Sequence, residues 1–216
     1  MDIKKGNTAE VFEYEKGKIC KLFYPGIPNM YAELEFKNAT ALLSSGICMP
    51  VPYEIINLNG RPGIIYEKIN GVPIWGQFGI NNIFEKFTSC HIKLMDSNAE
   101  GLVSYKDFLT KMLELKTNGK IPYNLQNKIC LLPDGKNVLH GDYHPGNVLL
   151  EPDGRLVLID FLNVCHGPKE YDVARTYFLL ENQLWQNHYL SKMGYYKEDI
   201  QKYLDIIETI HKYEKF

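Results

Sequence analysis

The sequence predicts an α+β fold in two parts, a small antiparallel sheet carrying one helix and then a mostly helical part. Three observations predict it. Short apolar runs separated by turn residues occur at residues 9–24 and 53–68, which is typical of antiparallel strands. From about Ile80 the apolar spacing becomes helical. Within the second part, a polar loop at residues 140–147 lies between two apolar runs, and a further apolar run ends in Asp160.

Composition and charge limit the possible partners. The 216 residues are 45% hydrophobic and 23% charged, which suits one sizeable core or two small lobes. A net charge of −2 shows no electrostatic footprint for nucleic acid or an anionic membrane surface. No apolar run is long enough to span a bilayer or to serve as a signal peptide. Five cysteines without a Cys-x-x-Cys pair predict free thiols, so we expect a cytoplasmic protein.

The first two predicted strands are residues 9–14 and 19–24, joined by a turn that contains Gly17. In the second strand, Lys21 shares one face with Ile19 and Phe23. A lysine among apolar residues is costly to bury unless an anion meets it. The pattern therefore predicts a phosphate or a carboxylate beside Lys21.

The helix predicted over residues 30–45 supplies a candidate carboxylate. Its apolar stripe includes Glu35, whereas Glu33 points elsewhere and has Lys37 four residues on, as in an exposed helix pair. The other members of the stripe are Ala32, Ala39 and Leu42. We therefore expect Glu35, rather than Glu33, to be the partner of Lys21.

The remaining elements follow from turn and period signals. Residues 53–57 and 63–68 form a predicted hairpin around Asn59-Gly60, which completes the small sheet. Helical periodicity then predicts helices over residues 80–95, 105–115 with Ser104 as N-cap, 122–131, 171–180 and 194–216. His91, in the first of these helices, is expected to be a packed core histidine.

The polar loop carries the chemistry. Asp142 and Asn147 are five residues apart, and the strand that follows ends in Asp160, so a hairpin would bring all three to one edge. Phosphoryl transfer needs a carboxylate that accepts the proton of the nucleophile, together with oxygen ligands that hold Mg²⁺ on the nucleotide phosphates. Asp142 suits the first task, and Asn147 with Asp160 suits the second.

The segment His-Gly-Asp-Tyr-His-Pro-Gly-Asn at residues 140–147 resembles the catalytic loop of the aminoglycoside phosphotransferase family, which includes choline kinases. The resemblance implies a bilobal protein kinase-like fold, with residues 1–68 as a nucleotide-binding N-lobe and residues 69–216 as a catalytic C-lobe. It implies Asp142 as catalytic base and Mg²⁺ held by Asn147 and Asp160. The cofactors would be ATP or GTP with Mg²⁺, and the acceptor a hydroxyl of a small molecule.

The same resemblance implies a nucleotide site built from a phosphate loop, a strand lysine with a helix glutamate, and a hinge between the lobes. Its expected members are Thr8, Ala9, Lys21, Glu35, Tyr66, Glu67 and Ile69. The main chain of Glu67 and Ile69 would bind adenine, with Tyr66 at the back of the pocket. By the same resemblance, Asp172 and Arg175 would brace the catalytic loop.

Two other functions remain open. One is a nucleotide-binding pseudokinase that acts as a regulatory module. The other is a metal-dependent hydrolase in which His140, Asp142 and His144 are metal ligands, although this leaves Lys21 and Asp160 without a role. No motif identifies the phosphate acceptor or specifies an oligomeric state.

Overall fold

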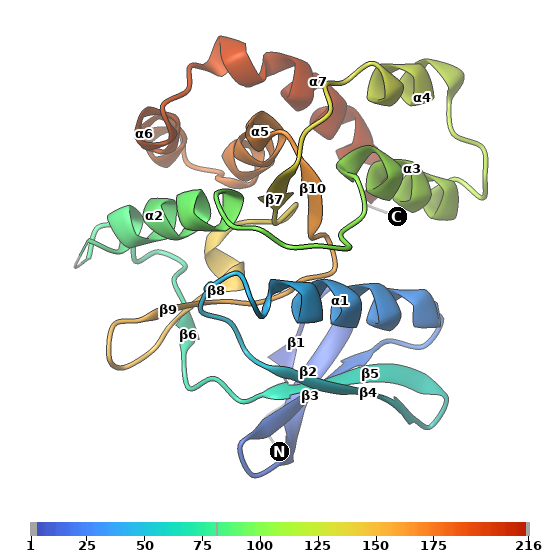
Figure 1. Cartoon of the computed structure of the whole chain (residues 1–216), viewed down its shortest axis with the longest axis vertical. Helices are drawn as coiled ribbons and strands as arrows, with labels where there is room; N and C mark the ends of the chain where they lie inside the picture. Colours follow the sequence, from blue (N-terminus) through green and yellow to red (C-terminus); the bar gives the residue numbers. More distant parts are fainter. Residues whose placement is uncertain (1–3, 81, 215–216) are drawn as a thin grey trace.

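The computed structural model describes residues 4–80 and 82–214. Figure 1 shows a small sheet at one end, helix α1 lying over it, and a helical body above, with the strands β6, β8 and β9 between the two parts. This arrangement confirms the predicted α+β fold class, with an antiparallel sheet and one helix preceding a mostly helical part.

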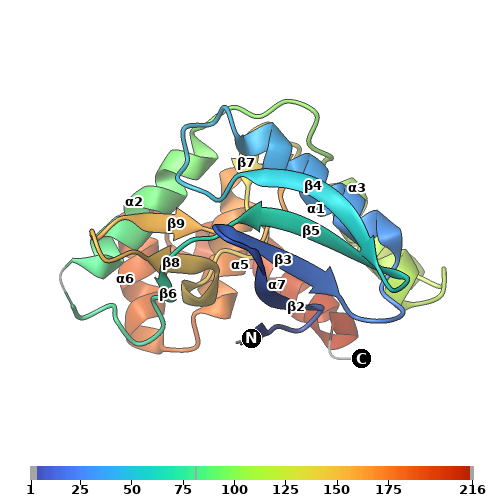
Figure 2. The same cartoon turned by 90° about the horizontal axis from the view of Figure 1, so that it is seen from below.

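The first sheet is antiparallel and follows the order β1-β2-β3-β5-β4 (Figure 2). Its strands are β1 (Lys4–Lys5), β2 (Ala9–Glu15), β3 (Lys18–Phe23), β4 (Pro52–Leu58) and β5 (Arg61–Glu67). Lys21 lies opposite Val11 on β2 and Ile64 on β5. The lysine is therefore held in the central strand of the sheet, where strands on both sides limit its movement.

Helix α1 (Asn29–Leu42) contacts β4 and β5. Its buried face consists of Tyr31, Ala32, Glu35, Asn38, Ala39 and Leu42. The helix ends at Leu42, short of the predicted Ser45, because both the amide and the hydroxyl of Ser45 donate to the carbonyl of Leu42, at 2.9 and 2.6 Å. These short-range bonds replace the helical pattern.

Six further helices are described in the second part: α2 (Ile83–Met95), α3 (Tyr105–Lys116), α4 (Tyr123–Cys130), α5 (Lys169–Leu179), α6 (Gln183–Met193) and α7 (Lys197–Glu214). Ser104 caps α3 as predicted, since its hydroxyl accepts from the amide of Asp107 at 3.0 Å. Helix α2 begins three residues later than predicted, after Asn82 in a left-handed conformation with φ of 57°.

The C-terminal region differs from the single predicted helix over residues 194–216. A separate helix, α6, precedes α7. Its N-cap is Asn182, whose side chain accepts from the amides of Leu184 and Trp185, and this residue type was the signal in the sequence for the start of the helix. Gly194 then ends α6 with φ of 77°, so α7 begins only at Lys197. The predicted apolar face of α7 is buried, and it comprises Ile200, Leu204, Ile207 and Ile210.

Five short strands are described in the second part, and they pair in two small sheets. They are β6 (Val72–Pro73), β7 (Asn137–Leu139), β8 (Val148–Leu150), β9 (Leu156–Leu158) and β10 (Cys165–Gly167). Strands β8 and β9 form the predicted hairpin, whereas β7 pairs with β10, for which the sequence pattern predicted no strand. Between β7 and β8 the polar loop contains a 3₁₀ turn at Pro145–Asn147, and Leu139 on β7 pairs with Cys165 on β10.

Two further observations concern the whole described chain. All five cysteines are free thiols, as predicted. Within residues 4–80 and 82–214, every helix is too short or too polar to cross a membrane.

Candidate active site

The β8–β9 hairpin brings Asn147 and Asp160 to one edge. Val148 pairs with Leu158, and the amide of Ile159 donates to the carbonyl of Asn147 at 3.0 Å. Asp160 follows directly, so it leaves the hairpin beside Asn147. The side-chain nitrogen of Asn147 also donates to the carbonyl of Asp142 at 3.0 Å and to its Oδ2 at 3.3 Å. The structure therefore brings together the three residues that the sequence pattern selected.

Asp142 is held as a carboxylate. Arg175 Nη2 lies 3.4 Å from Asp142 Oδ1, and His144 Nε2 lies 3.6 Å from Oδ2. Burial alone would raise the pKa of Asp142, but the interaction with His144 and the charge of Arg175 outweigh it and lower the pKa to about 2. The group is therefore ionised at neutral pH, as a proton acceptor must be.

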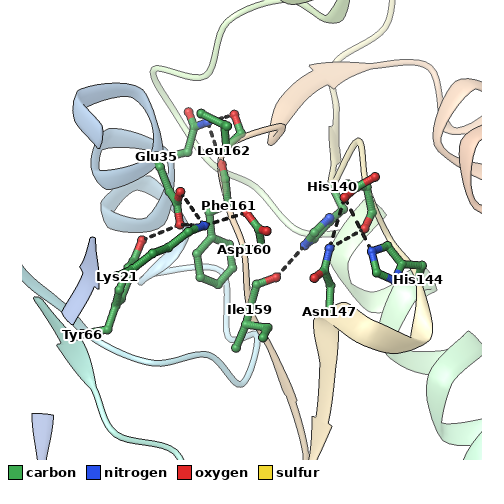
Figure 3. A network of polar contacts seen from close by, with 12 residues as sticks. Lys21, Glu35, Tyr66, His140, His144, Asn147, Ile159, Asp160, Phe161 and Leu162 are labelled. Atoms are coloured by element: carbon green, nitrogen blue, oxygen red, sulfur yellow. Dashed lines mark hydrogen bonds and ion pairs between the residues drawn. The ribbon is translucent and has the colours of Figure 1, made fainter. Parts of the chain in front are cut away.

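Lys21 joins the sheet, helix α1 and the β8–β9 hairpin in one ion-pair cluster (Figure 3). Its Nζ donates to both carboxylate oxygens of Glu35 at 2.8 Å and to Asp160 Oδ1 at 3.0 Å. The side chain of Glu35 is only 1% exposed. Burial alone would lower the pKa of Lys21, but the charges of Asp160 and Glu35 raise it overall. The predicted pairing of Lys21 with Glu35 is therefore present, and Asp160 extends it.

Asp160 has an unusual backbone conformation. Its φ of 68° is in the left-handed region, which is uncommon for residues other than glycine. Such strain persists only where the surroundings hold it, and it is concentrated at functional sites. Here the bond to Lys21 and the hairpin before Asp160 hold the side chain, and 39% of it is exposed. A ligand can therefore reach this carboxylate.

A buried carboxylate braces the loop that carries Asp142. Asp172 accepts hydrogen bonds from the amides of His140 at 2.7 Å and Gly141 at 2.8 Å, as well as from His91 Nε2 at 2.9 Å. Burial alone would raise the pKa of Asp172, but these donors lower it overall. The bracing expected from the resemblance is thus present in the geometry. A tight turn is also required, because a Cβ on Gly141 would lie 2.4 Å from the carbonyl oxygen of Asn163.

Sequence reasoning missed two polar supports. His91 is fully buried, as predicted for a core histidine, but it also bonds Asp172 and lies 2.7 Å from the hydroxyl of Tyr189. Asn38, also fully buried, donates from Nδ2 to the carbonyls of Phe161 and Val164 at 2.9 Å. The available signal for Asn38 was a polar residue one turn after Glu35, in the same apolar stripe. This bond ties α1 to the segment that follows Asp160.

The predicted hinge lies at the end of β5. Tyr66 is buried, and its hydroxyl donates to Glu35 Oε1 at 3.2 Å, so it lies directly behind the lysine–glutamate pair. The amide of Glu67, at the end of β5, donates to the carbonyl of Val51, just before β4, at 2.9 Å. Ile69 follows the end of β5. If Glu67 binds adenine through its main chain, its carbonyl oxygen would therefore make the contact.

The predicted phosphate-loop residues lie at the start of β2, the strand that pairs with β3, which carries Lys21. The turn before β2 is closed by the amide of Gly6, which donates to the carbonyl of Ala9 at 2.9 Å. The carbonyl of Thr8 accepts from the amide of Tyr24, also at 2.9 Å. Ala9 pairs with Phe23, two residues along β3 from Lys21. Thr8 and Ala9 therefore lie near the lysine, although their contact with a nucleotide stays a prediction.

The donor chemistry around the loop suits Mg²⁺ better than a transition metal. The nitrogen of Asn147 faces Asp142, so its amide oxygen faces away from that carboxylate, and one oxygen of Asp160 remains beyond the bond to Lys21. Oxygen ligands of this kind fit a hard cation. By contrast, His140 is fully buried, and its Nε2 lies 3.2 Å from the carbonyl of Ile159. That contact gives His140 a packing role and speaks against the hydrolase hypothesis.

Comparison with known proteins identifies similar sequences and similar folds. The sequence profile described as the phosphotransferase enzyme family matches residues 129–204, which include the polar loop and the β8–β9 hairpin. No curated protein matches the chain significantly. Among solved structures, the choline kinase LicA from Streptococcus pneumoniae is similar with a TM-score of 0.67 at 18% identity, over 99% of this chain and 84% of LicA.

Two aminoglycoside phosphotransferases are also similar. An aminoglycoside-3'-phosphotransferase of type VIII has a TM-score of 0.71 at 16% identity, over 96% of this chain and 91% of its own. An aminoglycoside phosphotransferase from Streptomyces rimosus, solved in complex with ADP and streptomycin, has a TM-score of 0.67 at 14% identity, over 91% of this chain and 88% of its own. The family resemblance is thereby confirmed: the chain has the protein kinase-like fold of aminoglycoside phosphotransferases and choline kinases, and residues 129–204 carry the sequence pattern of the phosphotransferase enzyme family.

Proposed function

We propose that this protein transfers the γ-phosphate of ATP or GTP to a hydroxyl group of a small molecule. The observation that carries the proposal is the convergence of Asp142, Asn147 and Asp160 on one edge, with the Lys21–Glu35 pair bonded to Asp160. The matching family and the ADP-bound neighbour support the same reaction class. Residues 1–68 would then form the nucleotide-binding lobe and residues 69–216 the catalytic lobe.

In this mechanism Asp142 orients the acceptor hydroxyl and receives its proton. A pKa of about 2 makes Asp142 a weak base. A weak base is sufficient, because the transition state of phosphoryl transfer is loose and positioning supplies most of the catalysis. The hydroxyl oxygen forms a bond to the γ-phosphorus while the bond from phosphorus to the β,γ-bridging oxygen breaks, and the electron pair stays with the nucleoside diphosphate.

The nucleotide phosphates would be held from both parts of the molecule. Lys21 would contact them from β3, oriented by Glu35, with the turn at Thr8 and Ala9 next to it on β2. Asn147 and Asp160 are the residues that would hold Mg²⁺, which neutralises charge on the phosphates when bound. Adenine or guanine would lie along the main chain at Glu67 and Ile69, with Tyr66 behind the pocket.

The test combines binding with turnover. Thermal shift with MgCl₂ plus ATP, compared with either alone, should show stabilisation by the combination. ADP release should then be measured against amino alcohols, sugars, aminoglycosides and nucleosides. Asp142→Asn should abolish release, whereas Asp153→Asn, in the exposed turn of the β8–β9 hairpin, should not.

Two results would redirect the assignment. Stabilisation by Mg·ATP without ADP release for any acceptor would favour the regulatory pseudokinase. Stoichiometric zinc or manganese in the purified protein, lost in His144→Ala and accompanied by no response to Mg·ATP, would favour the hydrolase.

A further inference from the structure

His144 lies next to the proposed base, and the mechanism described so far gives it no contact with the nucleotide or the acceptor. It follows Asp142 by two residues and immediately precedes the 3₁₀ turn at Pro145–Asn147. Its Nε2 lies 3.6 Å from Asp142 Oδ2, and 21% of its side chain is exposed. The ring is therefore close to the reacting centre and open to a ligand.

One hydrogen bond decides which ring nitrogen of His144 carries the proton. The amide of Gly146 donates to His144 Nδ1 at 3.0 Å. A ring nitrogen that accepts a hydrogen bond needs its lone pair, so the proton of the neutral ring is on Nε2. The distance of 3.6 Å to Asp142 exceeds that of a direct hydrogen bond. The Nε2–H group is thus a donor beside the carboxylate with capacity left for a bound ligand.

The ring is held in this orientation from the side by Trp75. The two ring centroids are 5.4 Å apart and the planes are inclined by 36°. A Cβ on Gly146 would lie 2.6 Å from Trp75 Nε1 and 2.7 Å from His144 Cε1, so the absence of a side chain lets both rings close over the turn. The amide of Ile74 donates to the carbonyls of Pro145 and Val148 at 3.1 Å. The segment that carries Trp75 is therefore fastened to the catalytic loop.

We propose that His144 is a catalytic residue whose Nε2–H donates a hydrogen bond to an oxygen of the phosphoryl group during transfer. Trp75 is the residue that positions it. The inference rests on the proposed function and deepens it. His144 transfers no proton: the hydroxyl proton passes to Asp142, and the imidazole stabilises the charge on the equatorial oxygens. A fixed donor aimed at such an oxygen is the kind of group that typically contributes most to transition-state stabilisation.

The geometry explains why the phosphoryl group would meet this donor. A hydroxyl bonded to Asp142 Oδ2 lies within about 3 Å of that oxygen. The γ-phosphorus that this hydroxyl attacks lies on the side of the hydroxyl oxygen that faces away from Asp142. Because Nε2 is only 3.6 Å from the same carboxylate oxygen, a phosphoryl oxygen on the His144 side of the phosphorus would accept a hydrogen bond from Nε2–H.

Two substitutions distinguish the role of Nδ1 as an acceptor from the role of Nε2 as a donor. His144→Asn places an amide oxygen near the position of Nδ1, so it can still accept from the amide of Gly146, but it removes the Nε2 donor. His144→Gln reaches the position of Nε2 with an amide group and loses the Nδ1 acceptor. His188→Asn is the matched control, because His188 is an exposed histidine on α6.

The measurement needs no acceptor substrate. Calorimetric titration should compare Mg·ADP with Mg·ADP plus aluminium fluoride, which imitates the planar phosphoryl group in transfer. The wild type and His188→Asn should bind more tightly when aluminium fluoride is present. His144→Asn should lose about 10- to 100-fold of this tightening, the usual effect of one hydrogen bond to a charged group. Its affinity for Mg·ADP and its melting temperature should be unchanged, and His144→Gln should retain part of the tightening. Trp75→Ala should weaken the tightening, and Trp75→Phe should weaken it less.

The remaining outcomes are also decisive. If His144→Gln loses the tightening and His144→Asn keeps it, His144 only accepts from the amide of Gly146 and the proposal is wrong. If both variants keep the tightening, or if the wild type binds Mg·ADP without gaining from aluminium fluoride, the proposal is also overturned. Loss in both variants with intact Mg·ADP binding supports it. A wild type that binds no Mg·ADP at all refutes the proposed function itself, and with it this inference.

Discussion

Removing Lys21 should destabilise the protein much more than removing the charge of Glu35. In Lys21→Met, the carboxylate of Glu35 stays buried at 1% exposure and keeps only the hydroxyl of Tyr66, at 3.2 Å. An uncompensated buried charge of this kind costs about 3–5 kcal/mol of unfolding free energy. In Glu35→Gln, Lys21 keeps Asp160 at 3.0 Å. We expect that variant to lose about 1.5–3 kcal/mol, the range for a hydrogen bond to a charged group.

The double variant decides whether the two residues act as a pair. Lys21→Met combined with Glu35→Gln leaves no buried carboxylate at position 35, so it should be more stable than Lys21→Met alone by about 1 kcal/mol or more. Urea unfolding followed by circular dichroism gives the four free energies. Glu33→Gln, at an exposed position on the same helix, should stay within about 0.5 kcal/mol of wild type.

The pH dependence of the unfolding free energy provides a second test of the same pair. Burial raises the pKa of Glu35, and without Lys21 nothing on β3 opposes this effect. A carboxyl group with a raised folded pKa favours the folded state at low pH, and this advantage is lost as pH rises through that pKa. The defect of Lys21→Met should therefore shrink as pH falls from 7 towards about 4, near the unfolded value for glutamate. Strict additivity in the cycle, or a Glu33→Gln effect as large as that of Glu35→Gln, would refute the pairing.

Three further outcomes are expected. Asp142→Asn should lower the rate of ADP release by about 10²–10⁴, because it removes the proton acceptor, while calorimetry shows Mg·ATP binding close to wild type; wild-type turnover would contradict the role. Because the pKa of Asp142 is lowered to about 2, the charged group stabilises the fold above the unfolded value of about 3.9 and loses this effect as pH falls towards 2. The difference in unfolding free energy between wild type and Asp142→Asn should therefore shrink over that pH interval, and a constant difference would argue against the interactions with His144 and Arg175. Asp160→Ala should abolish the Mg²⁺-dependent part of nucleotide binding, measured with ATP in MgCl₂ and in EDTA, whereas Asp153→Ala should leave it intact; a retained Mg²⁺ dependence would exclude Asp160 as a ligand.

Local spacing was enough to predict the groups that meet within one element or between neighbouring elements. Glu35 could be selected over Glu33 because only Glu35 lies in the apolar stripe of its helix, and the buried side chain next to Lys21 agrees with that choice. The convergence of Asn147 and Asp160 followed from a single short hairpin. Element boundaries were less accurate where side chains compete for backbone groups, as Ser45 does at the end of α1.

Only the tertiary structure decided which distant residues support the site. His91 and Asp172 are 81 positions apart, and Asn38 lies more than 120 positions before the carbonyls that it bonds. Hydrophobic periodicity marks such residues as buried but carries no information about their partners. The left-handed backbone of Asp160 is likewise set by its surroundings. The amino-acid sequence by itself determined which polar groups of the candidate site meet and approximately where, because this depends on hydrophobic periodicity within each element and on short connections between elements. The orientation of these groups depends on polar contacts between distant segments, which form only once the whole chain has packed.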